Sequence, residues 1–420
     1  MPSPTALIPA AYRALLVDRR TRRLLGAMGV SSLGDGMSAV TVAWLAIQVG
    51  PARHVGVYVG LALAAYTLPG VVGALAFAPL LRRRNARSLV LANCLLRAGF
   101  LGTIGLLWAL GTLSQVGYVG LLAGSSVMAA WGNAGKYTLL AELGGESGRL
   151  AANSLASTQE FLAVIIGPSL AGLLLAPIGP GALIALDAAS FAFLGVQAWR
   201  VPRDIPERPA EPIDRKAAES GLRLLRRPDL LRLIVLTWAF FFLYGPVEDA
   251  LPVYVARDLH ASAGLLGAYW SAFGVGALAA TLITGTLRNH DIRRTTLLIV
   301  AGWGACLVPF GFAPVGVTLV CFAVGGLVYG PFVPLSYALF QAATTPHRLA
   351  SVLAARSAVV MTASPLGMAL GGPIVGAVGA SRTLALSGAA TVALAATAGV
   401  VRPRSRNSGP PETAEGCPIE

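Results

Sequence analysis

The most regular feature of the chain is a succession of apolar stretches separated by short connectors rich in Arg, Gly and Pro. An α-helix needs about 20 mostly apolar residues to cross a bilayer, at roughly 1.5 Å of rise per residue. The stretches from Ala268 to Leu287 and from Val317 to Phe340 reach that length without one charged residue. The pattern therefore predicts an all-α integral membrane protein.

Twelve membrane-spanning helices are predicted, six before and six after a long polar segment at 201–229 that contains five prolines. Their ranges are 24–49, 55–81, 88–110, 116–140, 152–176 and 181–200, then 230–255, 262–287, 295–314, 317–341, 350–376 and 381–401. We interpret the chain as a basic N-terminal arm (1–23), a six-helix bundle (24–200), a linker (201–229) that ends in a short amphipathic helix near 215–227, a second six-helix bundle (230–401) and a tail (402–420).

Composition supports the membrane interpretation, because 55% of residues are hydrophobic, only 12% are charged and the mean hydropathy is +0.69. The net charge of +13 would otherwise raise nucleic acid as a partner. However, 25 of the 32 Lys and Arg residues fall in the termini and in alternate connectors, and only Arg53, Arg257 and Arg382 fall in the others. The positive-inside rule then predicts a multi-pass protein of the cytoplasmic (inner) membrane with both termini in the cytoplasm, and no nucleic-acid partner.

Ionisable residues inside predicted spans are the candidates for function, since such a group costs about 2.5–3.5 kcal/mol at the bilayer centre. Asp35 lies near the middle of the first span, between two glycines. Two interpretations are open. Its carboxyl group binds a proton or contacts substrate, or it serves a structural role, as a cap at a helix kink or in an ion pair with Arg97 or Lys136.

Three further carboxylates are candidates for proton coupling or substrate binding. Glu160, on the fifth span, is either a second protonation site or the buried partner of Lys136 or Arg356. Glu248 and Asp249 follow Tyr244-Gly245-Pro246 near the outer end of the seventh span, where they either attract cations to the outer mouth or are simply solvated. Asp187 is expected to reach water from the outer end of the sixth span.

Other chemistries find no support in the sequence. The segment Ala130 to Tyr137 mimics a phosphate-binding loop but lacks the first Gly and the Mg²⁺-binding Ser or Thr. The four histidines lie in connectors without nearby acidic or cysteine clusters, and Cys94, Cys306 and Cys321 lie within apolar stretches. We therefore expect no metal, no cofactor and no enzyme activity, which leaves an ion gradient as the energy source.

A short internal repeat divides the chain. Arg149-Leu150-Ala151 precedes the fifth span and Arg348-Leu349-Ala350 precedes the eleventh, and Gly172 and Gly371 follow at the same separation. Such spacing is typical of two parallel repeats related by an axis along the membrane normal.

The chain resembles the major facilitator superfamily, and within it the drug and siderophore exporters of the enterobactin-exporter type. The residues that carry this resemblance are Ser32 to Gly36, Leu139 to Leu143, Asn153 to Leu155, Gly167 to Gly172, Gln341 to Arg348 and Pro365 to Gly367. Gly167, Pro168 and Gly172 are similar to the helix-break motif of antiporters. One connector departs from the family pattern, because Arg82, Arg83, Arg84 and Arg87 occur without an acidic residue. It either gates the cycle or only fixes topology.

The resemblance implies a monomeric secondary transporter in which two six-helix bundles rock about a central cavity. The function we expect is export of a small amphipathic compound, such as a drug, natural product or siderophore, in exchange for protons. The alternatives are proton-coupled uptake of a metabolite and a sensor that transports nothing.

Overall fold

The computed structural model describes residues 17–77, 84–201, 221–284 and 291–400, and all regular elements in these segments are helical. The first half contains α2 (Arg19–Val49), α3 (Val55–Ala76), α5 (Ala86–Ala109), α6 (Gln115–Ser126) and α7 (Ala129–Trp199). The second half contains α9 (Pro228–Val253), α10 (Ala263–Thr284), α11 (Ile292–Leu307), α12 (Val315–Tyr329), α13 (Phe332–Ala342), α14 (Pro346–Val360), α15 (Ala363–Val378) and α16 (Ala380–Val400). Each predicted span overlaps one or more of these helices.

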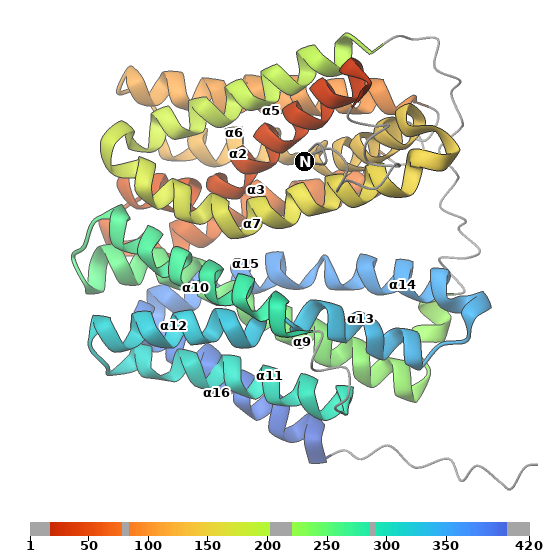
Figure 1. Cartoon of the computed structure of the whole chain (residues 1–420). Helices are drawn as coiled ribbons and strands as arrows, with labels where there is room; N and C mark the ends of the chain where they lie inside the picture. The colour runs from red at the N-terminus through yellow and green to blue at the C-terminus, as the bar shows by residue number, and fades with distance from the viewer. Residues whose placement is uncertain (1–16, 78–83, 202–220, 285–290, 401–420) are drawn as a thin grey trace, which may run out of the picture.

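Polar side chains begin several of the helices. Asp18, Asn85, Ser114 and Asp291 each accept a backbone N–H from the first turn of α2, α5, α6 and α11, respectively. Such caps satisfy donors that the helix itself leaves unpaired. The long α7 reverses direction instead of running straight, and one reversal lies at Gly179, whose φ of 77° is available to glycine at little cost (Figure 1).

The helices of the two halves form two groups that lie one above the other in Figure 1. Ten described helical segments are long and apolar enough to cross a membrane, and one of them, Ala151–Trp199, contains two of the predicted spans. The fold is therefore the predicted all-α membrane fold. The count of twelve and the domain boundaries remain predictions. Of the predicted amphipathic helix near 215–227, residues 221–227 are described, and 221–225 are helical.

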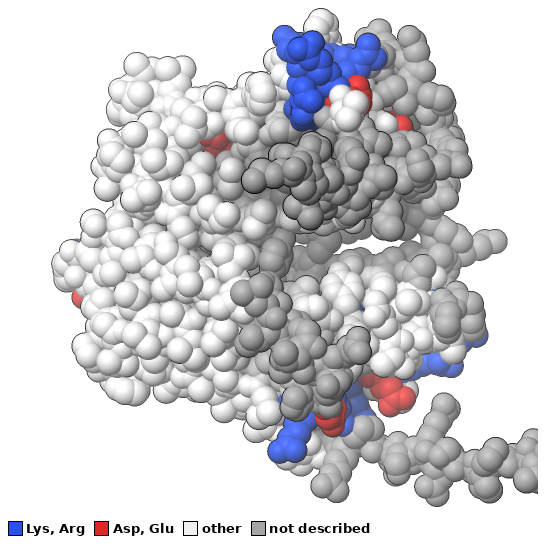
Figure 2. Space-filling view, in the orientation of Figure 1, with Lys and Arg blue, Asp and Glu red and all other residues white. Residues whose placement is uncertain are grey.

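Charged side chains gather toward one end of the molecule, at the right of Figure 2, and most of the remaining described surface in that view is uncharged. Apolar side chains such as Leu95, Val116 and Leu173 are more than two-thirds exposed. An uncharged, apolar surface of this kind suits a protein that is surrounded by lipid.

Each half contains an equivalent close contact between two glycines. Gly36 of α2 lies against the backbone of Gly167 of α7, and Gly245 of α9 lies against Gly367 of α15 in the same way. Small residues allow such approaches between helices in a membrane. The structure thus gives the internal repeat a three-dimensional counterpart.

The two halves meet through a second pair of glycine contacts. Gly60 of α3 packs on Gly372 of α15, and Gly172 of α7 packs on Gly267 of α10, so close that no Cβ fits at either contact. These contacts correct the repeat predicted from sequence by one residue, because the counterpart of Gly172 is Gly372 and not Gly371. Both contacts lie near the end of the molecule opposite the start of α2.

Candidate functional site

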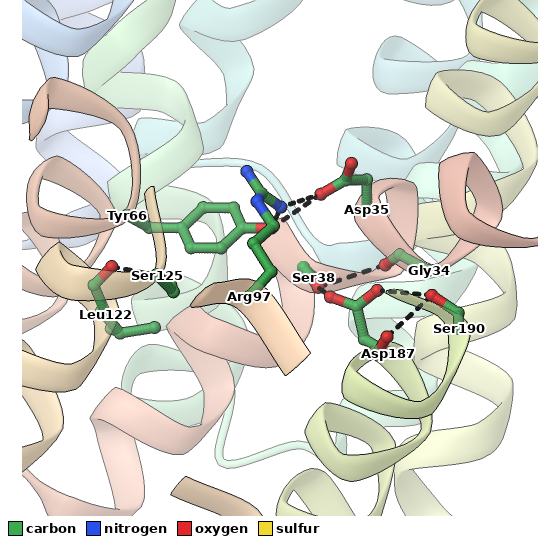
Figure 3. Close-up of polar contacts among 9 residues, drawn as sticks. All are labelled: Gly34, Asp35, Ser38, Tyr66, Arg97, Leu122, Ser125, Asp187 and Ser190. Carbon is green, nitrogen blue, oxygen red and sulfur yellow. Dashed lines mark hydrogen bonds and ion pairs between the residues drawn. The ribbon is translucent and has the colours of Figure 1, made fainter. Parts of the chain in front are cut away.

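A buried polar cluster lies inside the first half, around Arg97 of α5. Its guanidinium forms an ion pair with Asp35 of α2, and Nη1 also lies 3.0 Å from the hydroxyl oxygen of Tyr66 of α3. The Tyr66 hydroxyl donates a 3.0 Å hydrogen bond to the Asp35 carboxylate. The guanidinium also faces the rings of Tyr66 and Phe191, with Cζ 5.2 Å and 4.9 Å from their centroids. The structure thus contains the predicted ion pair between Asp35 and Arg97 (Figure 3).

Asp187 belongs to the same region, and the expectation that it reaches water is wrong. Its side chain is only 2% exposed, and it accepts hydrogen bonds from Ser38 of α2 at 2.6 Å and from Ser190 at 3.3 Å. Gly34 provides the room, because a Cβ there would collide with Asp187 and Ser190. Asp187 lies too deep in the bundle to extend to the surface, and the two serines replace water as donors (Figure 3).

We call Asp35, Tyr66, Arg97 and Asp187, with Ser38 and Ser190, the polar cluster. It contains two carboxyl groups and one guanidinium. With all three ionised its formal charge is minus one, and a single added proton makes it neutral. A buried group of this composition can bind and release a proton.

Glu160 has a different partner from those predicted. The Tyr137 hydroxyl donates a 2.7 Å hydrogen bond to its carboxylate, and neither Lys136 nor Arg356 forms an ion pair with it in the described residues. Lys136 is only 4% exposed. Arg356, 3% exposed, donates to the Ser336 hydroxyl at 2.5 Å and stacks 3.9 Å from the centroid of the Tyr337 ring.

Glu248 and Asp249 are not solvated residues at a helix end. Asp249 is completely buried, and the backbone of Gly371 lies directly beside its carboxyl group. Glu248 is half-buried and accepts a 3.1 Å hydrogen bond from Ser364 of α15. Both therefore lie against α15 inside the second half, and the prediction of a solvated pair is wrong.

The basic connector is only partly described, and Arg82 and Arg83 lie outside the described residues. Arg84 is exposed. Arg87 donates to the carbonyl oxygens of Ala198 at 3.2 Å and Trp199 at 2.5 Å, at the end of α7. A cation at this position also interacts favourably with the helix dipole. Arg87 therefore binds the C-terminus of α7.

Three members of the polar cluster, Ser38, Tyr66 and Ser190, were not expected from sequence. Hydroxyl groups are common in membrane helices, where most bond to their own helix, as Thr103 bonds to the Gly99 carbonyl at 2.8 Å. Among the cluster members that were not chosen as candidate site residues, only Asp187 had a sequence signal, because it is a carboxylate within an apolar stretch. Its predicted depth depended on where the sixth span begins.

Comparisons with known proteins agree with this fold. The multidrug efflux pump Tap of Mycobacterium tuberculosis is 27% identical over 364 residues, which are 83% of this chain and 85% of that protein. The uncharacterized MFS-type transporter y4rN of Sinorhizobium fredii is 29% identical over 250 residues, 57% of this chain and 60% of that protein.

Solved structures show the same fold at low identity. A POT family peptide transporter superposes with a TM-score of 0.69 at 13% identity, over 94% of this chain and 99% of that one. The nucleoside transporter NupG gives a TM-score of 0.66 at 14% identity, over 90% and 99%.

The family described as transmembrane secretion effector matches residues 14–410, nearly the whole chain. The relatives and the solved structures that this chain resembles are transporters and not enzymes. The chain therefore belongs to this transmembrane secretion effector family and is a membrane transporter of the major facilitator type.

Proposed function

We propose that the protein exports a small amphipathic compound across the cytoplasmic membrane in exchange for protons. The observation that carries this proposal is the polar cluster, in which the buried carboxyl group of Asp187 and the partly exposed carboxyl group of Asp35 lie around one guanidinium. Buried charge without a counter-ion costs several kcal/mol, so the cluster responds to a proton by rearranging its partners. In this scheme Asp35 and Asp187 together handle the proton, and Arg97 and Tyr66 hold Asp35 in place.

The arrangement of the halves supports alternating access. The glycine contacts join them at one end, and the positive-inside rule predicts that the opposite end, where α2 begins, faces the cytoplasm. In that orientation the joined end faces the outside, which agrees with a state that receives cargo from the cytoplasm. Export is favoured over uptake because Tap, which matches 83% of this chain, is named an efflux pump.

The test uses purified protein in liposomes with an acidic interior and a fluorescent pH probe. A panel of dyes, antibiotics and siderophores is added outside. An exchanged substrate releases protons from the lumen, whereas a co-transported one does not. We expect release with the wild type, and little with Asp187→Asn or Asp35→Asn.

The matched control is Asp229→Asn, which changes an exposed carboxylate in the first turn of α9. It is expected to exchange like the wild type. If no compound moves protons in the wild type, the exporter proposal fails and a sensor role gains support. If both cluster variants retain full coupling, the proton is handled elsewhere.

A further inference from the structure

The glycine contacts align the two halves residue by residue. Asp35 directly precedes Gly36, and Tyr244 directly precedes Gly245, its counterpart in the second half. Asp187 and Ser387 follow Gly179 and Gly379 at the same separation, and both of these glycines have positive φ. Each also bonds to the first helix of its half, because the Ser387 hydroxyl donates to the Leu243 carbonyl at 2.5 Å.

Two further positions align in the same manner. Arg97 and Trp303 lie at equal distances from the N-caps of α5 and α11. Tyr66 and Phe273 lie at equal distances from Gly60 and Gly267, the glycines that join the halves. The polar cluster in the first half is therefore replaced in the second half by Tyr244, Phe273 and Trp303.

Trp303 contacts both Tyr244 and Phe273, and all three rings contact Tyr329 of α12. The ring centroids of Trp303 lie 5.8 Å from Tyr244, 5.6 Å from Phe273 and 5.6 Å from Tyr329. Trp303 is 1% exposed, whereas the other three rings are half-buried and keep part of their surface free. We call Tyr244, Phe273, Trp303 and Tyr329 the aromatic wall.

Glu248 lies one helical turn beyond Tyr244 on α9, and the Tyr244 ring in turn contacts the Tyr329 ring, with the centroids 5.6 Å apart. The only hydrogen bond of Glu248 in the described structure comes from Ser364, and no ion pair reaches it there. The contrast with Asp35 is sharp, since that carboxylate already has a guanidinium as its counter-ion. Glu248 is thus a half-buried acidic group that pairs with no cation in the described residues and lies near rings that keep part of their surface free.

We propose that Glu248 and the aromatic wall form the cargo site, and that the cargo is an organic cation with an apolar or aromatic body. A cation is attracted to the faces of Tyr, Phe and Trp rings, and more strongly where water is excluded. It also supplies the counter-ion that Glu248 lacks. An anionic siderophore would meet a carboxylate and electron-rich ring faces, and is disfavoured.

This inference rests on the proposed export function and names its substrate class. It assigns separate tasks to the halves. The first half handles the proton in the polar cluster, and the second half binds the cargo at Glu248.

The test is equilibrium binding to purified protein in detergent, which does not require transport. Tetraphenylphosphonium is titrated by isothermal calorimetry, and neutral triphenylphosphine oxide serves as an uncharged probe of similar shape. The wild type is expected to bind the cation at least tenfold more tightly than the neutral probe. Glu248→Gln is expected to lose most of that preference and to keep its affinity for the neutral compound.

Two further variants separate the charge from the rings. Tyr244→Leu is expected to weaken both probes, because it removes ring surface and leaves the carboxylate. Asp229→Asn is the control on the same helix and is expected to bind like the wild type. The folding of all variants is first compared by gel filtration and thermal unfolding. If Glu248→Gln is poorly folded, Glu248→Asp takes its place in the test. Because Glu248→Asp retains the charge, it should keep part of the preference for the cation.

The inference is overturned if Glu248→Gln binds tetraphenylphosphonium as tightly as the wild type, or if the wild type shows no preference for the cation. Failure of the export function gives a different pair of results. In that case the binding assay still shows the cation bound at Glu248, but in the liposome assay no compound releases protons.

Discussion

The guanidinium of Arg97 and the carboxylate of Asp35 form the one ion pair recorded in the described part of the chain, and the Tyr66 hydroxyl lies within hydrogen-bonding distance of both. Arg97 is 7% exposed. Four helices meet around it, because α2 supplies Asp35, α3 supplies Tyr66 and α7 supplies Phe191 and Asp187. This contact therefore fixes both the packing of the first half and the charge of its polar cluster.

Replacing Arg97 by Met should destabilise the protein, because buried Asp187 and partly exposed Asp35 would lose the cation of the polar cluster. Removal of one partner of a buried pair costs about 3–5 kcal/mol. We expect a lower midpoint of thermal unfolding, measured by intrinsic fluorescence in detergent. The double variant Arg97→Met with Asp35→Asn should recover part of the loss. Equal midpoints for the wild type and Arg97→Met would show that the pair contributes nothing.

Replacing Ser38 by Ala should remove the 2.6 Å hydrogen bond to Asp187 and leave one carboxylate oxygen without that donor. A lost partner of a buried polar group costs about 1–3 kcal/mol. Thermal unfolding of Ser38→Ala is compared with Thr103→Ala, whose exposed hydroxyl bonds only to its own helix. If the two variants have the same midpoint, Ser38 is not a significant partner of Asp187.

Replacing Gly172 by Ala should prevent the close contact of α7 with α10, because the added Cβ would overlap Gly267. If the halves must meet there to close one side of the cavity, transport falls several-fold. Labelling of a cysteine introduced beside the joint reports whether that side stays open.

Gly99→Ala is the matched control for this prediction, since nothing lies within 4 Å of a Cβ at Gly99. It should transport and label like the wild type. Normal transport by Gly172→Ala would mean that the glycine joint does not limit the cycle.

Asp18, outside the spans, should make the start of α2 sensitive to acid. Hydrogen bonds from Thr21, through its side chain and its backbone N–H, lower the pKa of the Asp18 carboxyl group below its ordinary value. Its stabilisation is therefore full above the unfolded-state pKa of about 3.9 and is lost as the pH falls through the lower folded-state pKa.

The measurement is thermal unfolding between pH 2 and pH 6 (about the range over which carboxyl groups titrate). Asp18→Asn keeps a capping side chain without the charge and should lose this acid-dependent contribution. Asp18→Ala should lower stability by about 0.5–2 kcal/mol at neutral pH. Identical acid profiles for the wild type and Asp18→Asn would contradict the prediction.

Hydrophobic patterning was sufficient to predict the membrane fold. A run of about 20 apolar residues can satisfy its backbone in a bilayer only as a helix, so the spans follow from local sequence. The same logic identified Asp35 as a candidate and Arg97 as one of its possible partners, because ionisable groups are rare in spans and need partners.

Tertiary structure decided how deeply each polar side chain is buried and which group it bonds to. Asp187 was assigned to the helix end and proved to be buried, since Ser38 and Gly34 on another helix provide the donor and the space. Glu160 bonds to Tyr137 and not to a cation. The sequence by itself determined which residues are apolar enough to enter the bilayer, a property of each segment. Which polar groups meet inside it depends on helix rotation and on close glycine contacts between segments distant in sequence, and these exist only in the packed structure.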